Sequence, residues 1–299
     1  MKKSEVANEQ PNTKVITLVL LLALLWGGNS VSIKIGLQDL PPLALAAVRF
    51  LMGLVVVTIW SLHRGIRIRL NSGEWLPLLF VSAIFILQII TLNVGTKITT
   101  ASRSTVFVST YPFFTALFAH FWVPGDRLSV RKTIGICVAF SGVLLTFAGS
   151  LQLEMHEDLL GDLIVLTSGC LLGLRTVVTK RLIQSIHPYR LLVWLMTFSV
   201  PCFFGLSVLW EREAHFHFST PGTAAILYQG LVIAGFCFLT WTSVLEKYSP
   251  SKLVVLFFVT PLAGVLLSYL LLGDTLNLSL IAGAGLVAYG IYLVNRKAE

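Results

Sequence analysis

Three arginine residues at membrane depth are the side chains of this sequence best suited to bind a charged ligand. Arg49, Arg103 and Arg175 each fall inside a mostly apolar stretch long enough to cross a bilayer. One arginine near the centre of a membrane-spanning helix costs about 2.5–3.5 kcal/mol, so three that faced lipid would cost on the order of 8–10 kcal/mol. We therefore expect these guanidinium groups to face a hydrated cavity or polar partners. Binding of each group to helix carbonyls near a membrane face is the open alternative.

Acidic residues are missing from the interior of the same stretches. All 14 Asp and Glu residues fall in loops, in tails or at the ends of apolar stretches, so we expect no carboxylate at membrane depth to neutralise the arginines. Uncompensated positive charge in a cavity favours an anion or a zwitterion that carries a carboxylate. The planar guanidinium group suits carboxylate and phosphate in particular.

Aromatic and amide side chains are spaced to complete such a site. Arg103 and Tyr111 fall on one stripe of a helix, and Trp26 and Asn29 are three residues apart on another. Aromatic stripes also serve ordinary packing, which stays an alternative for each of them. The predicted substrate-binding residues are Trp26, Asn29, Arg49, Arg103, Tyr111, Arg175, Tyr228 and Trp241. For the last two, an interhelical hydrogen bond or an interface anchor is the alternative.

Two prolines are placed to act as hinges. Pro112 and Pro261 fall inside apolar stretches, where a proline removes one helical hydrogen bond and leaves a carbonyl free. Kinks at matching positions of two helices would serve as hinges in a transporter. A fixed bend required by packing is the alternative.

Motifs of catalysis and metal binding are absent from the sequence. It contains no GxSxG, HExxH or GxxxxGK[ST] motif, and its four cysteines form no CxxC pair. We expect no enzyme activity, no metal site and no cofactor.

The elements that must position these residues are membrane-spanning helices. The chain of 299 residues is 56% apolar and 12% charged, whereas soluble proteins are about 25% charged. Backbone amides must be paired inside lipid, and a run of about 20 residues suits one helical crossing. The predicted fold class is an all-α integral membrane protein with ten transmembrane helices. Their expected ranges are 15–35, 43–62, 75–95, 99–122, 132–149, 161–181, 189–210, 222–244, 252–272 and 278–294.

The distribution of basic residues orients this topology. With the N-terminus in the cytoplasm, 16 of the 22 Lys and Arg residues fall on the cytoplasmic side. This is the positive-inside pattern, so we expect both termini in the cytoplasm. The net charge of +8 therefore requires no nucleic-acid partner.

An internal repeat divides the chain into two halves. A Gly-Asp-x-Leu pattern followed by two regularly spaced glycines begins at Gly125 and again at Gly273, 148 residues later, and Lys34 matches Lys180 at an offset of 146. Because five helices per unit is an odd number, the second unit enters the membrane from the opposite side, as in many secondary transporters. The expected division is a cytoplasmic tail at 1–14, a first five-helix repeat at 15–149, an external linker at 150–160, a second five-helix repeat at 161–295 and a cytoplasmic tail at 296–299.

Short motifs of the first half are shared with a known family. They are Trp26-Gly27-Gly28-Asn29 followed by Lys34, then Arg49-Phe50, then Pro112 and Gly125-Asp126-x-Leu128. On these residues the chain resembles the EamA-type members of the drug/metabolite transporter superfamily. The resemblance implies a multi-pass protein of the inner (plasma) membrane that exports amino acids, metabolites or toxic compounds. Its partners would be a small-molecule substrate and the lipid bilayer, with no nucleic acid, and both a monomer and a homodimer remain open.

The expected function is secondary transport by alternating access through a central cavity. The substrates would be amino acids or other carboxylate-bearing or amphipathic solutes. With no proton-binding carboxylate expected at membrane depth, we predict uniport, exchange or coupling through the charge of the substrate itself. A membrane-embedded enzyme or a lipid-head-group processing protein is the alternative, and a covalently changed product would identify it.

Overall fold

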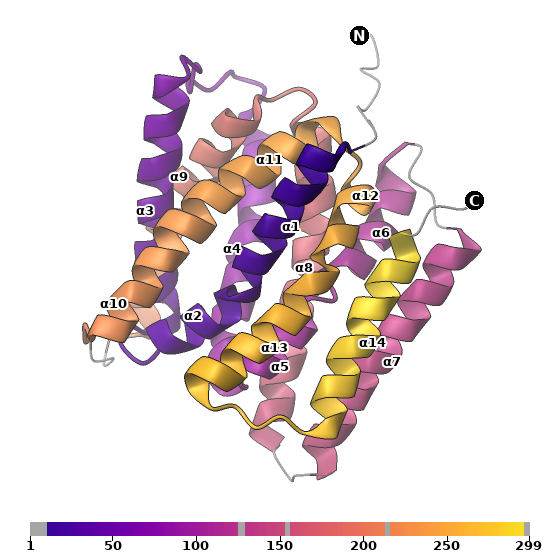
Figure 1. Ribbon diagram of the computed structural model, residues 1–299. Coiled ribbons are helices and arrows are strands. Elements are labelled where there is room, and N and C mark those ends of the chain that lie inside the picture. Colours follow the sequence, from indigo (N-terminus) through magenta and orange to yellow (C-terminus); the bar gives the residue numbers. More distant parts are fainter. Residues whose placement is uncertain (1–10, 125–128, 153–155, 213–215, 296–299) are drawn as a thin grey trace.

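The protein is a bundle of helices that pass up and down between its two ends (Figure 1). The computed structural model describes residues 11–124, 129–152, 156–212 and 216–295. Within these described ranges, six helical segments are long and apolar enough to cross a membrane. The predicted all-α membrane fold is confirmed.

The first half of the chain, up to residue 152, forms seven helical segments among the described residues. They are α1 (Thr13–Gly27), α2 (Asn29–Gly36), α3 (Pro42–His63), α4 (Trp75–Ile98), α5 (Ala101–Val108), α6 (Tyr111–Trp122) and α7 (Val130–Gln152).

The second half contains a π-helix, η1, and a 3-10 helix, η2, in addition to α-helices. Its described segments are α8 (His156–Leu182), α9 (Pro188–Trp210), α10 (Thr220–Leu227), η1 (Tyr228–Cys237), α11 (Phe238–Lys247), α12 (Pro250–Val254), η2 (Val255–Phe258), α13 (Val259–Leu272) and α14 (Leu278–Asn295).

The six long segments agree with their predicted ranges to within three residues at each end. They are Thr13–Gly36, Pro42–His63, Trp75–Ile98, Leu159–Leu182, Pro188–Trp210 and Thr220–Lys247. The other four predicted ranges overlap shorter or interrupted helices. The range 99–122 overlaps α5 and α6, 132–149 overlaps α7, 252–272 overlaps α12, η2 and α13, and 278–294 overlaps α14. The count of ten crossings stays a prediction. The first Gly-Asp-x-Leu copy, Gly125 to Leu128, lies outside the described residues, as do 153–155 of the predicted linker and most of both predicted tails.

Several predicted segments are interrupted. Gly28 separates α1 from α2, and Ser109 and Thr110 separate α5 from α6. The expectation that Pro112 and Pro261 lie inside helices is wrong, because each occupies the first turn of a helix, α6 and α13 respectively. Backbone N–H groups of a first turn have no partner within their own helix, so a proline there removes no hydrogen bond.

Two lysines at corresponding positions make corresponding contacts. Lys34 and Lys180 each donate hydrogen bonds from Nζ to three backbone carbonyls at the C-terminal end of a neighbouring helix, α4 and α11 respectively. The acceptors are Thr96, Lys97 and Thr99 for the first lysine and Leu245, Glu246 and Tyr248 for the second. Each acceptor of the second set follows its counterpart by 149 residues. Both lysines therefore satisfy carbonyls that a helix terminus leaves unpaired.

The most extensive helix contacts join the two halves, and they pair α7 with α14, α4 with α8, and α3 with α9. At the edge formed by α7 and α14 (Figure 1), a Cβ added to Gly290 would lie 2.5 Å from the Ala139 Cβ, and one added to Gly142 would lie 2.6 Å from the Gly283 oxygen. These glycines therefore allow α7 and α14 to approach each other closely.

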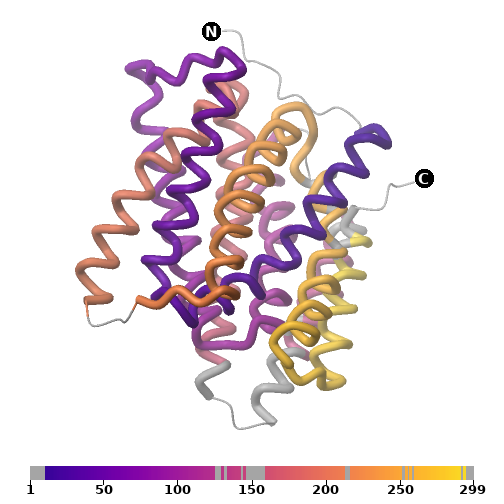
Figure 2. Tube along the Cα trace, turned by 60° about the vertical axis from the view of Figure 1, so that its left-hand side comes forward, coloured from indigo at the N-terminus to yellow at the C-terminus, as the bar shows by residue number. Residues whose placement is uncertain are grey.

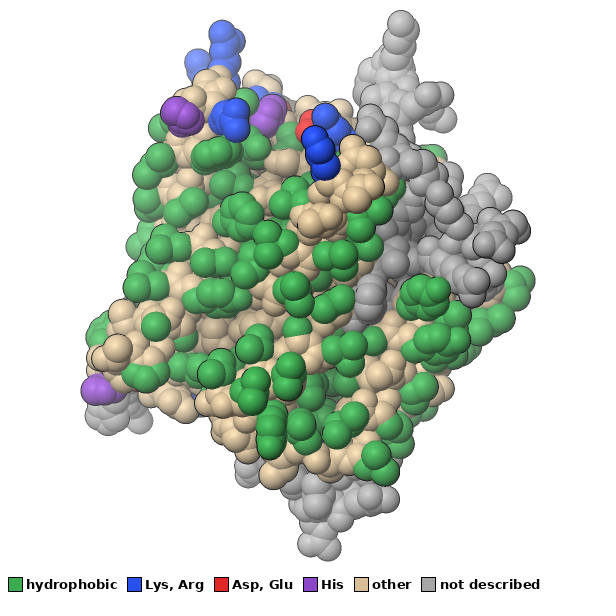
Figure 3. Space-filling view, in the orientation of Figure 1, with side chains coloured by type: hydrophobic (Ala, Val, Ile, Leu, Met, Phe, Trp, Pro, Cys, Tyr) green, Lys and Arg blue, Asp and Glu red, His purple; other side chains and the backbone are tan. Residues whose placement is uncertain are grey.

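The outer surface is largely apolar between the two ends of the bundle. Figure 3 shows hydrophobic side chains along the middle of one face, with Lys and Arg side chains at the end where α1 begins. The beginning of α1 and the end of α14 lie toward this same end in both views (Figure 1 and Figure 2). An apolar belt of this kind suits contact with lipid tails.

Candidate functional site

A central cavity lies between the two halves of the chain. The space between its lining residues, including the part open to solvent, is about 830 Å³. The described residues that line it come from eleven elements and from Ser109 between α5 and α6, whereas α7, α9 and α14 contribute none of them. Six of the eight predicted site residues line this cavity: Trp26, Asn29, Arg49, Tyr111, Arg175 and Trp241.

Matching positions of the two halves face the same space. The lining contains seven pairs of residues that are related by the offsets of the internal repeat. The pairs are Trp26 with Leu172, Asn29 with Arg175 and Ser30 with Thr176 at an offset of 146, and Ile89 with Phe238, Leu92 with Trp241, Val108 with Phe257 and Tyr111 with Thr260 at an offset of 149. The cavity is thus formed along the interface between the two halves.

Arg175 brings a positive charge into the cavity without an ionic partner. Its guanidinium carbon lies 4.9 Å from the ring centre of Phe85 and 5.3 Å from that of Phe238. Among the described residues no side chain or carbonyl forms a hydrogen bond or ion pair with this half-buried group. Contact with the faces of aromatic rings stabilises the cation and leaves its N–H donors available.

Arg49 is buried deeper, with 2% of its surface exposed. Its guanidinium group donates to Gln229 Oε1 at 2.9 Å and to Asn93 Oδ1 at 3.2 Å, and it lies 4.7 Å from the ring centre of Phe50. Both hydrogen-bond acceptors are neutral amides, and Arg49 Nε has no partner among the described residues. Arg49 therefore also carries a charge that its protein partners do not neutralise.

The π-helix η1 supplies one of these amides. Gln229, at its second position, accepts from Arg49 and donates Nε2 to the Ser32 carbonyl at 2.9 Å. On the opposite side, Asn93 donates to the Pro42 carbonyl at 2.8 Å. These bonds orient both amide oxygens toward the guanidinium group. π-Helices are rare and occur often at functional sites.

The structure does not place Arg103, a predicted substrate-binding residue, at the cavity. It forms a buried ion pair with Asp162, which also accepts from Thr99 Oγ1 at 2.7 Å. The expectation that no carboxylate neutralises the arginines is wrong for Arg103. Helix α8 begins at His156, so Asp162 lies inside the helix rather than at its end. Arg103 is absent from the described cavity lining, and its pairing avoids the cost of an isolated buried charge.

Tyr228 also lies outside the described cavity lining. Its hydroxyl donates to the Leu25 carbonyl at 2.5 Å, which joins η1 to α1. The alternative of an interhelical hydrogen bond is therefore the one that the structure supports.

Four cavity-lining residues have buried polar atoms without a partner among the described residues. They are Asn29 Oδ1, Arg49 Nε, Gln88 Oε1 and Ser109 Oγ. Most buried polar atoms in proteins are hydrogen-bonded, so a group of unpaired ones around a cavity indicates capacity for a polar ligand.

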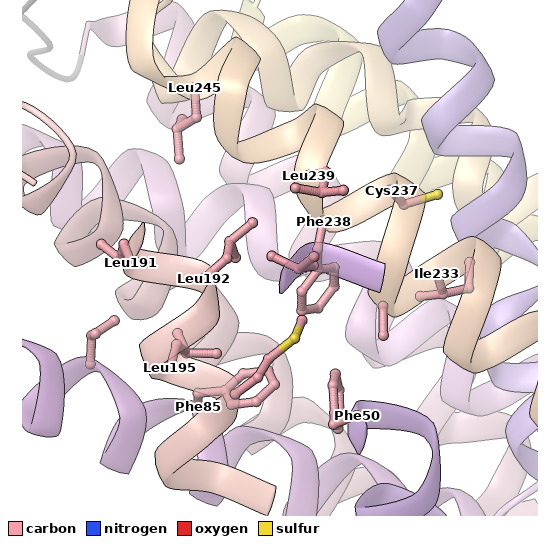
Figure 4. Close-up of a cluster of buried hydrophobic side chains, with 14 of the residues drawn as sticks. Phe50, Phe85, Leu191, Leu192, Leu195, Ile233, Cys237, Phe238, Leu239 and Leu245 are labelled. Atoms are coloured by element: carbon pink, nitrogen blue, oxygen red, sulfur yellow. The ribbon is translucent and has the colours of Figure 1, made fainter. Parts of the chain in front are cut away.

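Aromatic rings form the walls of the cavity. Trp26, Trp241 and Phe257 contact one another with ring centres 5.2 to 6.2 Å apart. Figure 4 shows a second group, in which Phe50, Phe85 and Phe238 point toward one another from different helices. Phe50, Phe238 and Phe257 line the cavity, and the sequence did not predict them as site residues. Phe85 contacts Phe50 and Phe238 but is not part of the described lining. The repeat offset could have found Phe238 and Phe257, because each matches a residue of the other half that also lines the cavity.

A second, smaller cavity continues from the first. It shares Arg175, Thr176, Phe238 and Trp241 with the central cavity and extends to Thr179, Thr242 and Leu245. These four shared residues lie at the junction of the two spaces.

Comparison with known proteins assigns the family. The sequence pattern of the EamA-like transporter family matches residues 13–148 and again residues 159–296. The chain belongs to the EamA-like transporter family. The resemblance that its motifs indicated is confirmed, and the relatives of this family described below are named as transporters rather than enzymes.

Relatives align over nearly the whole chain. The uncharacterized transporter YoaV of Bacillus subtilis is 23% identical over 281 residues, which cover 94% of this chain and 96% of the relative. A Salmonella typhimurium protein named "Probable amino-acid metabolite efflux pump" is 27% identical over 284 residues, covering 92% and 93%. One solved crystal structure superposes with a TM-score of 0.72 at 17% identity, covering 94% of this chain and 96% of the other. This last likeness concerns the fold alone.

Proposed function

We propose that this protein is a secondary transporter that exports amino acids or other carboxylate-bearing or amphipathic solutes by alternating access. The family assignment supports transport in general. The observation that carries the finer proposal is the unpaired guanidinium group of Arg175 in a cavity between matching residues of the two halves. One relative is named as an amino-acid metabolite efflux pump, which favours export and this class of substrate.

The proposed architecture is ten crossings in two oppositely inserted five-helix repeats, 15–149 and 161–295. The corresponding contacts of Lys34 and Lys180 support this division. We propose that the repeats move relative to each other at the interruption that precedes Pro112 and at the 3-10 helix η2 that precedes Pro261. The positive-inside pattern supports an inner (plasma) membrane location with both termini in the cytoplasm.

The proposed substrate site contains the six predicted residues that line the cavity. In it, the two arginines bind acidic groups, Asn29 offers its unpaired amide oxygen, and the aromatic residues Trp26, Tyr111 and Trp241 contact the apolar part of the solute. Arg103 is assigned instead to fixing α5 against α8 through its ion pair with Asp162.

The described lining of the cavity contains no Asp or Glu residue that could bind and release a proton for coupling to a proton gradient. We therefore propose uniport, exchange or coupling through the charge of the substrate itself. The test is flux of labelled amino acids and organic acids in proteoliposomes, with and without a pH gradient. Unaltered solute should cross without requiring the gradient. Strict proton dependence that survives replacement of His120 contradicts the coupling proposal, and a covalently changed solute contradicts the carrier itself.

A further inference from the structure

The charge of the cavity defines its ligand more closely than the family does. Its described lining contains two arginines and no Asp or Glu, and arginine stays protonated in proteins. Building on the transport function proposed above, we propose that the ligand is a small solute with two acidic groups, such as a dicarboxylate or an acidic amino acid. Arg49 and Arg175 would each bind one of these groups.

The hydrogen bonds of Arg49 leave its charge for a ligand. Its acceptors, Gln229 and Asn93, are neutral amides that orient the guanidinium group, and its Nε donor is unpaired at a position that is 2% exposed. A buried cation is costly unless an anion compensates it. A ligand that carried a single negative charge at Arg175 would leave this second cation uncompensated.

The two guanidinium groups are held on different aromatic rings. Arg49 lies 4.7 Å from the Phe50 ring centre, the Phe50 and Phe85 ring centres are 4.8 Å apart, and Arg175 lies 4.9 Å from the Phe85 ring centre. These three contacts limit the distance between the guanidinium carbons to about 14 Å. Two charge-assisted hydrogen bonds of about 2.8 Å and a short carbon chain fit within that limit. Two separately anchored cations provide one partner for each of two acidic groups.

Two unpaired hydrogen-bond acceptors lie in the same cavity. Asn29 Oδ1 and Gln88 Oε1 are buried without a partner among the described residues. Each can accept a hydrogen bond from a hydroxyl or ammonium group. An acidic amino acid or a hydroxylated dicarboxylate therefore uses groups that a plain dicarboxylate leaves unpaired.

The test compares pairs of solutes of equal shape that differ by one charge. Proteoliposomes containing the full chain are given succinate or succinamate, and L-glutamate or L-glutamine, and the initial flux of each solute is measured. We expect each solute with two carboxylates to be preferred over its amide by at least about tenfold, the effect of one charge-assisted hydrogen bond. Equal flux, preference for the amide, or no flux of succinate and glutamate overturns the inference.

Variants test whether Arg49 causes the preference for solutes with two carboxylates. In Arg49→Gln the ratio of dicarboxylate flux to amide flux should fall to about one. Arg212→Gln changes an exposed arginine outside the cavity and should retain the wild-type ratio. A monodisperse Arg49→Gln protein that keeps the full preference contradicts the role of Arg49. If this variant does not fold, the comparison within the wild-type protein still decides the substrate class. Flux of a monocarboxylate without flux of succinate or glutamate overturns only this inference. A wild-type protein that transports none of the tested solutes overturns the proposed function.

Discussion

Replacing Arg175 by glutamine should weaken ligand binding strongly while leaving the protein nearly as stable. In the structure this guanidinium group contacts two aromatic rings and has no hydrogen bond or ion pair among the described residues. Its donors are therefore available to the ligand, and a hydrogen bond to a charged group is worth about 1.5–3 kcal/mol. The variant should raise the Kd by about 10- to 150-fold.

The same geometry predicts a small effect on folding. The substitution removes two cation–π contacts, worth about 0.5–2 kcal/mol each, but also relieves the cost of an uncompensated charge in a low-dielectric site. We expect the free energy of unfolding to change by less than about 1 kcal/mol. Arg103→Gln is the matched control, because it leaves Asp162 buried without its ionic partner and should cost about 3–5 kcal/mol.

Two measurements test this prediction. Ligand binding is followed by quenching of the fluorescence of Trp26 and Trp241, which line the cavity, with a solute that the wild-type protein transports. Stability is measured by unfolding in mixed micelles with increasing denaturing detergent. An unchanged Kd for Arg175→Gln, or a loss of stability as large as that of Arg103→Gln, would refute the reasoning.

Three further predictions concern the framework and its symmetry. Lys180→Met should destabilise the protein by about 2–4 kcal/mol, because three helix-end carbonyls lose a fully buried donor. Lys34→Met, at a partly exposed site, should cost less. Equal losses of stability in unfolding experiments would contradict this prediction. Gly290→Ala should cost about 1–3 kcal/mol because its Cβ would meet helix α7, whereas Gly205→Ala, with no atom within 4 Å, should be neutral or stabilising in the same assay. Trp241→Ala should lower flux because this ring lines the cavity, and unchanged flux would exclude this side chain from the solute path.

The positions of the long helices were predictable because the thickness of the bilayer determines them. A run of about 20 apolar residues satisfies both the hydrocarbon core and the backbone, so hydropathy alone locates its ends. The interruptions within those runs were not predictable in this way. Gly28 and the pair Ser109 and Thr110 lie in stretches that are apolar enough for a continuous helix, and only the packing of neighbouring helices decides that the chain breaks there. The π-helix at Tyr228–Cys237 has the composition of an ordinary helix.

The candidate site was predictable where charge at membrane depth restricts a side chain to a few environments. Arg49 and Arg175 were found for this reason. Arg103 was misassigned because Asp162 follows a run of acidic residues that resembles a loop, and α8 extends back through this run. The partners of Arg49 escaped notice because amides such as Asn93 and Gln229 are ordinary in membrane helices.

The paired lining of the cavity suggests how the two halves of the protein could change conformation. Two halves of nearly the same construction hold different local geometries, for example a π-helix in the second half where α4 of the first half is a plain α-helix. An exchange of these geometries between the halves is the change that the alternating access proposed above requires. The seven residue pairs of the cavity lining therefore give positions at which distance measurements between paired labels would detect such an exchange.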